Sequence, residues 1–112
     1  MRQRVALIRT LALRPKLVLL DEPFSALDMI TKSQMHEWYL SVMRSVRLST
    51  ILITHDVDEA IMLSDRIYLL TGTPGEIRHE IKVTASRDHR KDFDLEPLFL
   101  KYKQGIREIL RA

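Results

Sequence analysis

Two acidic residues directly follow a run of aliphatic residues near the start of this 112-residue chain. The segment LVLLDEPFSALD, residues 17–28, places Asp21 and Glu22 after four aliphatic residues, and Pro23 then ends the run. A short continuous apolar run is typical of a strand that is buried on both faces in a parallel sheet. Two carboxylates at the end of such a strand suit Mg²⁺ binding and the orientation or deprotonation of a water molecule.

A second aliphatic run ends in the same way. The segment STILITHD, residues 49–56, places His55 and Asp56 after a predicted strand. Ligands of open α/β sheets bind beyond the carboxyl ends of the strands, so we expect Asp21, Glu22 and His55 to share one crevice. Phosphoryl transfer uses a carboxylate for Mg²⁺ and a group that activates the attacking water, and an imidazole can contact the transferred phosphate.

Each motif taken alone also has a structural interpretation. The Asp-Glu pair before a proline fits a solvated exit from a strand, and His55 after a strand fits an ordinary structural histidine. Asp56 is also suited to cap a helix. Ser25, His55 and Asp28 contain the residue types of a hydrolase triad, but the chain has no nucleophile elbow. The order and spacing of the two motifs together favour a chemical role.

The elements that must position these groups alternate between helices and strands. Apolar periodicity predicts helices and strands in turn, which implies an α/β fold with a parallel sheet in at least the first two-thirds of the chain. The expected helices span residues 2–13, 28–48, 56–64 and 97–110, and the expected strands span residues 16–21, 49–55, 65–71 and 76–83.

Helical spacing also predicts which side chains pack inward. The second expected helix begins at a cap residue, Asp28, and the charged segment 85–94, which includes Arg90, reads as a solvated connection. The expected packed face of the second helix consists of Met35, Trp38, Val42 and Val46, and that of the last helix of Phe99, Tyr102, Ile106 and Ile109.

The composition excludes several classes of function. With 46% hydrophobic and 29% charged residues, the chain is typical of a globular domain rather than a disordered one. A formal charge of +3 indicates a mixed surface and no nucleic-acid partner. The absence of cysteine excludes disulfides and thiolate chemistry. No apolar run approaches the roughly 20 residues that a membrane-spanning helix needs.

Together the motifs resemble one family, the ATP-binding-cassette (ABC) ATPases. LVLLDEPFSALD resembles the Walker B and D-loop segment of the family, and ILITHDVDEAIMLSDRIYLL resembles its switch-histidine segment. MRQRVALIRTLALRPK is similar to the helix that follows the LSGGQ signature. The resemblance covers residues 1–83. TGTPGEI, residues 71–77, further resembles importers of nitrate, sulfonates, taurine or thiamine-precursor-like compounds.

The resemblance implies a fold and a set of residue roles. The fold would be the C-terminal half of a P-loop NTPase domain, a three-layer α/β arrangement with mostly parallel strands, plus a C-terminal strand and an amphipathic helix. Residues 1–83 would form the partial ATPase domain, and residues 84–112 a charged linker and the C-terminal helix. The resemblance assigns Asp21 to Mg²⁺, through water, and Glu22 to the general base. It assigns Asp28 to nucleotide binding and to the D-loop contact across a dimer. It places His55 near the γ-phosphate.

The resemblance also implies cofactors, partners and a location. The cofactors would be ATP and Mg²⁺. The partners would be a second ATPase subunit, in a head-to-tail dimer, and the transmembrane permease subunits of an importer. The protein would be cytoplasmic and peripheral on the inner face of the membrane. The transported solute is not encoded here, because in such importers other subunits select it.

Several family motifs are missing from the sequence. The phosphate-binding pattern G-x-x-x-x-G-K-[S/T], the glutamine loop and the LSGG of the signature do not occur, and the three glycines are Gly72, Gly75 and Gly105. We therefore expect the chain alone to bind ATP weakly and not to be a competent ATPase. The chain would then be a truncated gene product, or its start codon would be misassigned. The alternatives are a non-catalytic remnant that binds transporter subunits, and a chromosome- or repair-type ATPase head, although no coiled-coil heptads flank the motifs.

Overall fold

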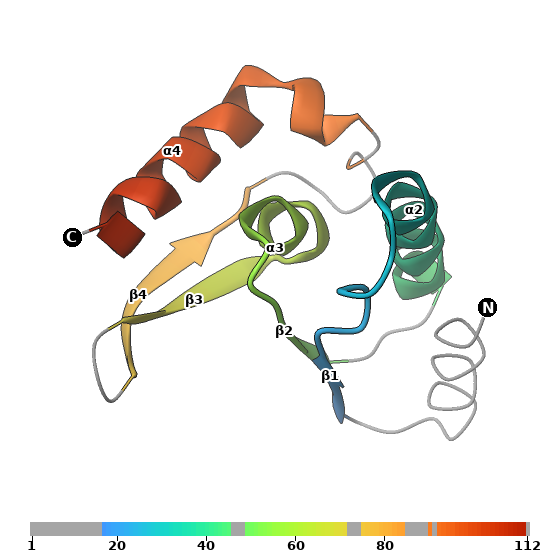
Figure 1. Ribbon diagram of the computed structural model, residues 1–112, viewed down its shortest axis with the longest axis horizontal. Helices are drawn as coiled ribbons and strands as arrows, with labels where there is room; N and C mark the ends of the chain where they lie inside the picture. Colours follow the sequence, from blue (N-terminus) through green and yellow to red (C-terminus); the bar gives the residue numbers. More distant parts are fainter. Residues whose placement is uncertain (1–16, 46–48, 72–74, 85–89, 91, 112) are drawn as a thin grey trace. The chain divides into compact units, whose positions relative to one another are not determined.

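The computed structural model describes residues 17–45, 49–71, 75–84, 90 and 92–111 (Figure 1). The chain divides into two compact units between His55 and Asp56. Each unit is described by itself below. The expected helix over residues 2–13 lies outside the described residues.

The first unit is a strand–helix–strand motif. It contains β1 (Leu17–Asp21), α2 (Met29–Ser45) and β2 (Ser49–Ile53). The two strands pair in parallel and in register, from Leu17 opposite Ser49 to Asp21 opposite Ile53. Both strands and the helix agree with the sequence-based expectation, and the parallel pairing confirms the α/β class for this part of the chain.

One face of this two-stranded sheet is packed and the other is exposed. Val18 and Leu20 are buried, and the hydroxyl of Thr50 lies 3.8 Å from the sulfur of Met43 on α2, so α2 covers this face. The sequence predicted strands buried on both faces, but among the described residues of this unit a single helix packs on the sheet. Side chains of the opposite face are between 43% and 63% exposed; they belong to Leu17, Leu19, Ile51 and Ile53.

The second unit contains a hairpin and three helical segments. Its elements are α3 (Val57–Leu63), β3 (Arg66–Thr71), β4 (Glu76–Lys82), the 3₁₀ helix η2 (Phe93–Leu95) and α4 (Pro97–Arg111). β3 pairs with β4 antiparallel, with a bulge between Leu69 and Leu70, and so does not extend a parallel sheet within the described residues. The four-residue connection 72–75 explains this difference, because a parallel crossover needs a dozen or more residues.

The core of the second unit confirms the predicted inner face of the last helix. Phe99 and Ile106 of α4 are buried, and the ring of Phe99 packs edge-on against Phe93 at 5.4 Å between centroids. Lys103 on α4 pairs with Asp58 on α3 at 2.9 Å. The remaining buried members of this core are Ile61, Ile67, Leu69 and Val83.

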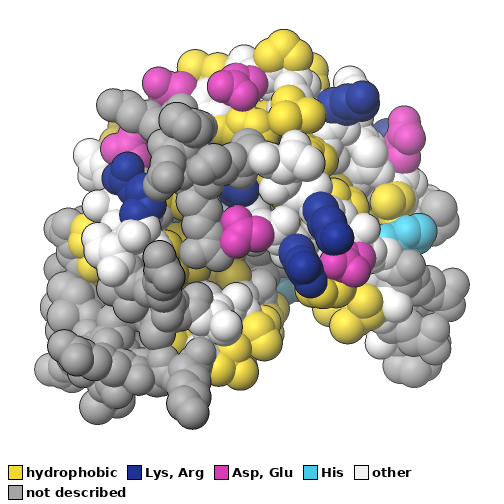
Figure 2. All heavy atoms as spheres, turned by 180° about the vertical axis from the view of Figure 1, so that it is seen from behind, with side chains coloured by type: hydrophobic (Ala, Val, Ile, Leu, Met, Phe, Trp, Pro, Cys, Tyr) yellow, Lys and Arg dark blue, Asp and Glu magenta, His cyan; other side chains and the backbone are white. Residues whose placement is uncertain are grey.

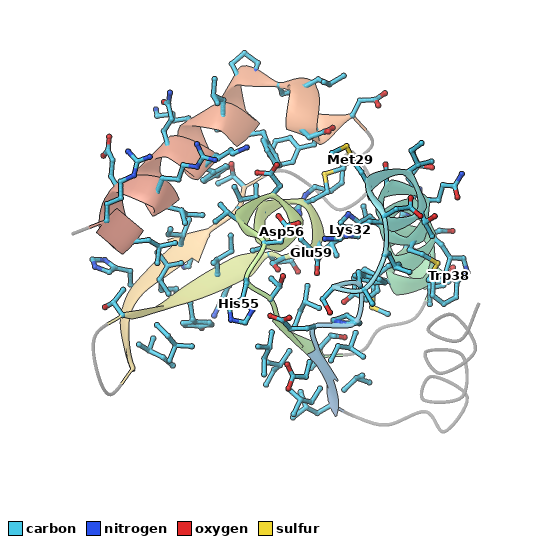
Figure 3. All side chains as sticks on the ribbon, in the orientation of Figure 1. Met29, Lys32, Trp38, His55, Asp56 and Glu59 are labelled. Atoms are coloured by element: carbon cyan, nitrogen blue, oxygen red, sulfur yellow. The ribbon has the colours of Figure 1, made fainter. Side chains whose placement is uncertain are left out.

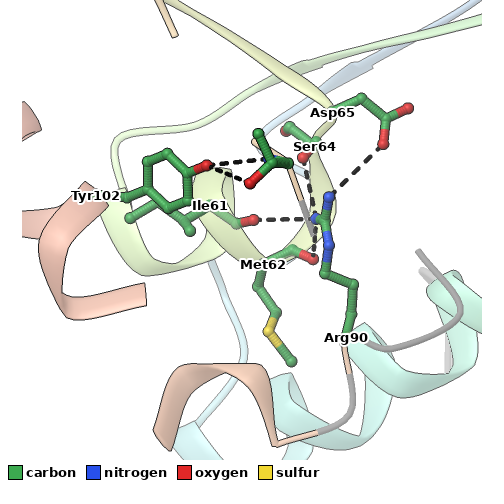
Figure 4. Close-up of polar contacts among 7 residues, drawn as sticks. Ile61, Met62, Ser64, Asp65, Arg90 and Tyr102 are labelled. Atoms are coloured by element: carbon green, nitrogen blue, oxygen red, sulfur yellow. Dashed lines mark hydrogen bonds and ion pairs between the residues drawn. The ribbon is translucent and has the colours of Figure 1, made fainter. Parts of the chain in front are cut away.

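Arg90 departs from the prediction of a solvated connection. Its side chain is fully buried, and Nη1 donates to the carbonyl oxygens of Ile61, Met62 and Ser64 at 3.0–3.1 Å (Figure 4). Nη2 lies 3.7 Å from a carboxylate oxygen of Asp65. The last carbonyl groups of a helix have no partner within the helix, so the guanidinium completes the C-terminus of α3.

Gly105 offers a direct test of the position of α4. It lies in the interior of the helix, is exposed, and has no atom within 4 Å of the place where a β-carbon would be added. Gly105→Ala should therefore raise the free energy of unfolding by about 1 kcal/mol, because alanine loses less backbone entropy in a helix. Urea unfolding measures the change; a loss of stability would show that residue 105 is not in an open helical position.

The surface carries charges of both signs. On the face seen in Figure 2, basic and acidic side chains are interspersed with hydrophobic ones. This agrees with the mixed surface expected from the composition. No helix within the described ranges is long and apolar enough to span a membrane.

Candidate functional site

The structure brings together Glu22 and His55, two of the residues predicted to carry chemistry. They come directly after β1 and shortly after β2, whose parallel pairing places both carboxyl ends at one edge (Figure 3). The backbone N–H of Glu22 donates to the carbonyl of Ile53 at 2.8 Å and so continues the strand pairing by one residue. The Oε1 atom of Glu22 forms a hydrogen bond with Nδ1 of His55.

The backbone of Glu22 adopts a rare conformation. Its φ of 47° lies in the left-handed region, which is uncommon for a residue other than glycine. The carbonyl of Glu22 accepts hydrogen bonds from the hydroxyl of Ser25 at 3.1 Å and from the backbone N–H of Ser25 at 3.4 Å. Strained residues of this kind persist where the surrounding structure holds them, and they cluster at functional sites.

The turn that carries Glu22 is anchored by an aromatic side chain. Phe24 is fully buried, and its ring packs edge-on against His36 at 5.1 Å and against Tyr39 at 6.0 Å, both on α2. The sequence interpretation did not assign a role to Phe24 or to Ser25. The available signal was an aromatic residue in the turn between the predicted strand and helix, and a serine three residues after the predicted base.

Asp21 occupies the last position of β1. It is exposed and lies opposite Ile53 in the parallel pair. No group of three or more potential ligands that could hold a metal ion occurs in the described part of the chain. Mg²⁺ is commonly bound through one or two carboxylates together with waters and substrate phosphates, so a single exposed carboxylate at this edge fits that donor chemistry.

Asp28 caps α2, which confirms one of its two predicted roles. Its Oδ1 accepts the backbone N–H of Thr31 and its Oδ2 accepts the hydroxyl of Thr31, both at 2.8 Å. The backbone N–H of Thr31 makes the largest contribution to lowering the pKa of the Asp28 carboxyl, followed by the hydroxyl. The contact of Asp28 across a dimer stays a prediction.

This cap predicts a pH dependence of folding. Because the pKa of Asp28 is lower in the folded chain, its ionised carboxylate stabilises the fold above the unfolded pKa of about 4, and this contribution is lost as the pH falls through the folded pKa. The stability difference between the native chain and Asp28→Ala should therefore shrink as the pH falls below about 4. Chemical denaturation across this range measures the difference.

A matched variant isolates the charge of the cap. Asp28→Asn keeps a cap oxygen that cannot ionise, so the stability difference between Asp28→Asn and Asp28→Ala should stay nearly constant with pH. If the difference between the native chain and Asp28→Ala is also constant with pH, the ionised cap does not stabilise α2.

Comparison with known proteins identifies relatives among import ATPases. No family model matches the chain. It is 41% identical over 118 residues to the nitrate import ATP-binding protein NrtD of Synechocystis, a match that covers 100% of this chain and 44% of that protein. It is 52% identical over 75 residues to the bicarbonate transport ATP-binding protein CmpC of Synechocystis, covering 67% of this chain and 11% of that protein.

A third relative comes from a different organism. The chain is 40% identical over 114 residues to the aliphatic sulfonates import ATP-binding protein SsuB 2 of Pseudomonas aeruginosa, which again covers 100% of the chain and 44% of that protein. The chain thus spans less than half the length of these relatives. The matches to NrtD and SsuB 2 cover the whole chain, with its Walker B-like and switch-histidine-like motifs, at 40–41% identity, and they place the chain in the family of ABC importer ATP-binding subunits.

Proposed function

We propose that this chain is the part of an ABC importer ATPase that supplies the groups which activate water for ATP hydrolysis. Hydrolysis would drive uptake of a nitrate-, sulfonate- or taurine-like solute. The observation that carries the proposal is the contact between Glu22 and His55 at the joined carboxyl ends of β1 and β2. A carboxylate and an imidazole held together at this edge suit the orientation and deprotonation of an attacking water.

Each residue of the edge has a role in this proposal. Asp21 would hold Mg²⁺ through water, and the ion would neutralise charge on the phosphates when bound. Glu22 would act on the attacking water, and His55 would lie beside the γ-phosphate. Asp28, at the start of α2, would contact the partner subunit's nucleotide site.

We also propose a specific fold for this chain, one half of a P-loop NTPase domain. The parallel pairing of β1 with β2 and the α2 crossover support one half of a P-loop NTPase with three layers. The sequence has no G-x-x-x-x-G-K-[S/T] pattern, so the groups that hold the β- and γ-phosphates would lie outside this chain. Residues 1–83 would belong to this ATPase core, and residues 84–112 to a C-terminal extension.

The expected partners follow from the same proposal. A second ATPase subunit would complete each nucleotide site in a head-to-tail dimer, and permease subunits would hold the ATPase at the cytoplasmic face of the membrane. No nucleic acid is expected to bind, given the mixed charges of the surface. The alternative is a non-catalytic module that binds transporter subunits without turning over ATP.

A chimera tests the proposal. In it, this chain replaces the matching segment of the Synechocystis NrtD protein, which supplies the remaining residues. We expect the chimera to hydrolyse ATP with Mg²⁺ and the isolated chain to show no turnover above background, because phosphate binding requires the other segment. The rate of phosphate release measures ATP hydrolysis by the chimera and by the isolated chain.

Two outcomes would contradict this expectation. A folded chimera that binds ATP without hydrolysing it would favour the non-catalytic alternative. Turnover by the isolated chain that disappears in Glu22→Gln would show that this chain holds the phosphates by itself.

A further inference from the structure

The backbone conformation of Glu22 is one that its own sequence disfavours. A β-carbon makes the left-handed region unfavourable for any residue other than glycine. A proline next in the chain favours an extended conformation, and Pro23 follows Glu22 directly. Glu22 nevertheless has a φ of 47°. Because the local sequence opposes this conformation, contacts with the rest of the first unit must impose it.

Two contacts hold the chain on the two sides of Glu22. Before its N–Cα bond, the N–H of Glu22 donates to the carbonyl of Ile53 at 2.8 Å as a continuation of the strand pairing. Beyond it, the buried ring of Phe24 packs against His36 and Tyr39 of α2. The single residue between them is Pro23, whose ring fixes its own φ. The backbone of Glu22 therefore takes up the change of direction.

The ring of Phe24 is a stronger hold on the turn than the hydrogen bonds that follow Glu22. Ser25 donates to the carbonyl of Glu22 at 3.1 Å from its hydroxyl and at 3.4 Å from its N–H. Ser25 is exposed, so water competes for both bonds. Phe24 is 0% exposed, and burial of a whole aromatic side chain stabilises more than an exposed hydrogen bond.

The φ angle of Glu22 decides where its carboxylate lies. Since the N–H of Glu22 is held by Ile53, rotation about the N–Cα bond turns the Cα–Cβ bond. Extended residues have φ between about −60° and −160°. Relaxation from 47° into that region would rotate the side chain by more than about 100° and remove it from its present place beside His55.

We propose that Phe24 is a positioning residue: its packing on α2 holds Glu22 in the left-handed conformation and so aims the Glu22 carboxylate. The catalytic consequence rests on the proposed function, whereas the origin of the strain does not. Two experiments therefore test the two parts separately.

The first experiment compares glycine with alanine at position 22 in the purified 112-residue chain, by urea unfolding. Glycine adopts a positive φ without strain, so the folded-to-unfolded ratio of Glu22→Gly should exceed that of Glu22→Ala by about three-fold. The same pair at Glu37, in the interior of α2, should give the opposite order by about five-fold, because glycine is unfavourable in a helix.

The role of Phe24 is tested by repeating the comparison with Phe24→Leu, which stays apolar but loses the edge-on ring contacts. We expect the advantage of glycine at position 22 to disappear in this background, because the turn can then relax. An equal advantage of glycine with and without Phe24→Leu overturns the proposal. So does an absence of any advantage in the chain that retains Phe24.

The second experiment measures ATP hydrolysis by the chimera with NrtD. Phe24→Leu should lower kcat by about 10- to 100-fold, since small misplacements of a reacting group have effects of this size, and should change KM by less than about two-fold. Met43→Ala is the control: Met43 is buried on α2 beside Thr50, so this change also weakens the packing of the helix but should leave kcat within about two-fold.

Equal kcat values for the Phe24→Leu and Met43→Ala chimeras overturn the positioning role. If the chimera with Phe24 retained hydrolyses no ATP, the proposed function fails, but the urea comparison still decides whether Phe24 imposes the strain on Glu22.

Discussion

Glu22→Gln in the chimera with NrtD should lower the rate of ATP hydrolysis by about 100- to 10,000-fold, the usual contribution of a general acid or base. The glutamine side chain keeps the shape of glutamate but loses its charge and its ability to take a proton. The loss is expected because an amide cannot take a proton from the attacking water as a carboxylate does. ATP binding should remain, since the change adds no bulk.

Single-turnover phosphate release and equilibrium ATP binding separate the two effects. Glu37→Gln is the matched control, because Glu37 is exposed on α2 and takes no part in the site. Hydrolysis by Glu22→Gln at near the rate of the Glu37→Gln control would remove Glu22 from the catalytic machinery. Equal losses of ATP binding and hydrolysis would instead indicate that Glu22 contributes to binding.

The contact between Glu22 and His55 was predictable because it follows from one general rule. Two aliphatic runs of strand length are separated by a segment of helix length, which predicts parallel neighbours. Parallel neighbours in register bring their carboxyl ends to one edge, and both residues come just after those ends. The left-handed backbone of Glu22 was not predictable, because a glutamate before proline carries no signal for positive φ.

The packed face of α2 was only partly predicted. Met35 is buried as expected, but Trp38 and Val42 are only partly buried, and Val46 lies outside the described residues. Tyr39 and Met43 are buried instead. Apolar residues occur nearly all around this helix, so spacing alone could not choose between neighbouring faces. The buried ring of Phe24 packs against Tyr39 and indicates which face packs inward, but this contact is visible only in three dimensions.

The antiparallel pairing of β3 could have been predicted from the sequence, whereas the burial of Arg90 depends on contacts that the sequence pattern does not encode. β3 has the same aliphatic character as the parallel strands, and its antiparallel partner is set by the short connection to β4. Arg90 lies in a segment of alternating charges that reads as solvated. Its partners are backbone carbonyls at the end of α3, and no side-chain pattern marks a carbonyl that lacks a partner.

Arg90→Met should therefore cost more stability than any surface substitution in this chain. Methionine fills much of the same volume but donates no hydrogen bond, so the carbonyls of Ile61, Met62 and Ser64 lose their shared donor. A buried polar group left without a partner costs about 1–3 kcal/mol, and the carbonyl of Ile61 is in a fully buried contact. We expect the free energy of unfolding to fall by about 3 kcal/mol in total.

That loss would be large for a chain of this size, because small domains are stable by only about 5–15 kcal/mol. The ion pair with Asp65 adds little to it, since the Asp65 carboxylate is 51% exposed and solvent screens the pair. Arg107→Met is the matched control: Arg107 is exposed on α4, so its replacement should change stability by less than about 0.5 kcal/mol. Urea unfolding of both variants decides the point. Equal midpoints for Arg90→Met and Arg107→Met would mean that the guanidinium of Arg90 does not hold the end of α3.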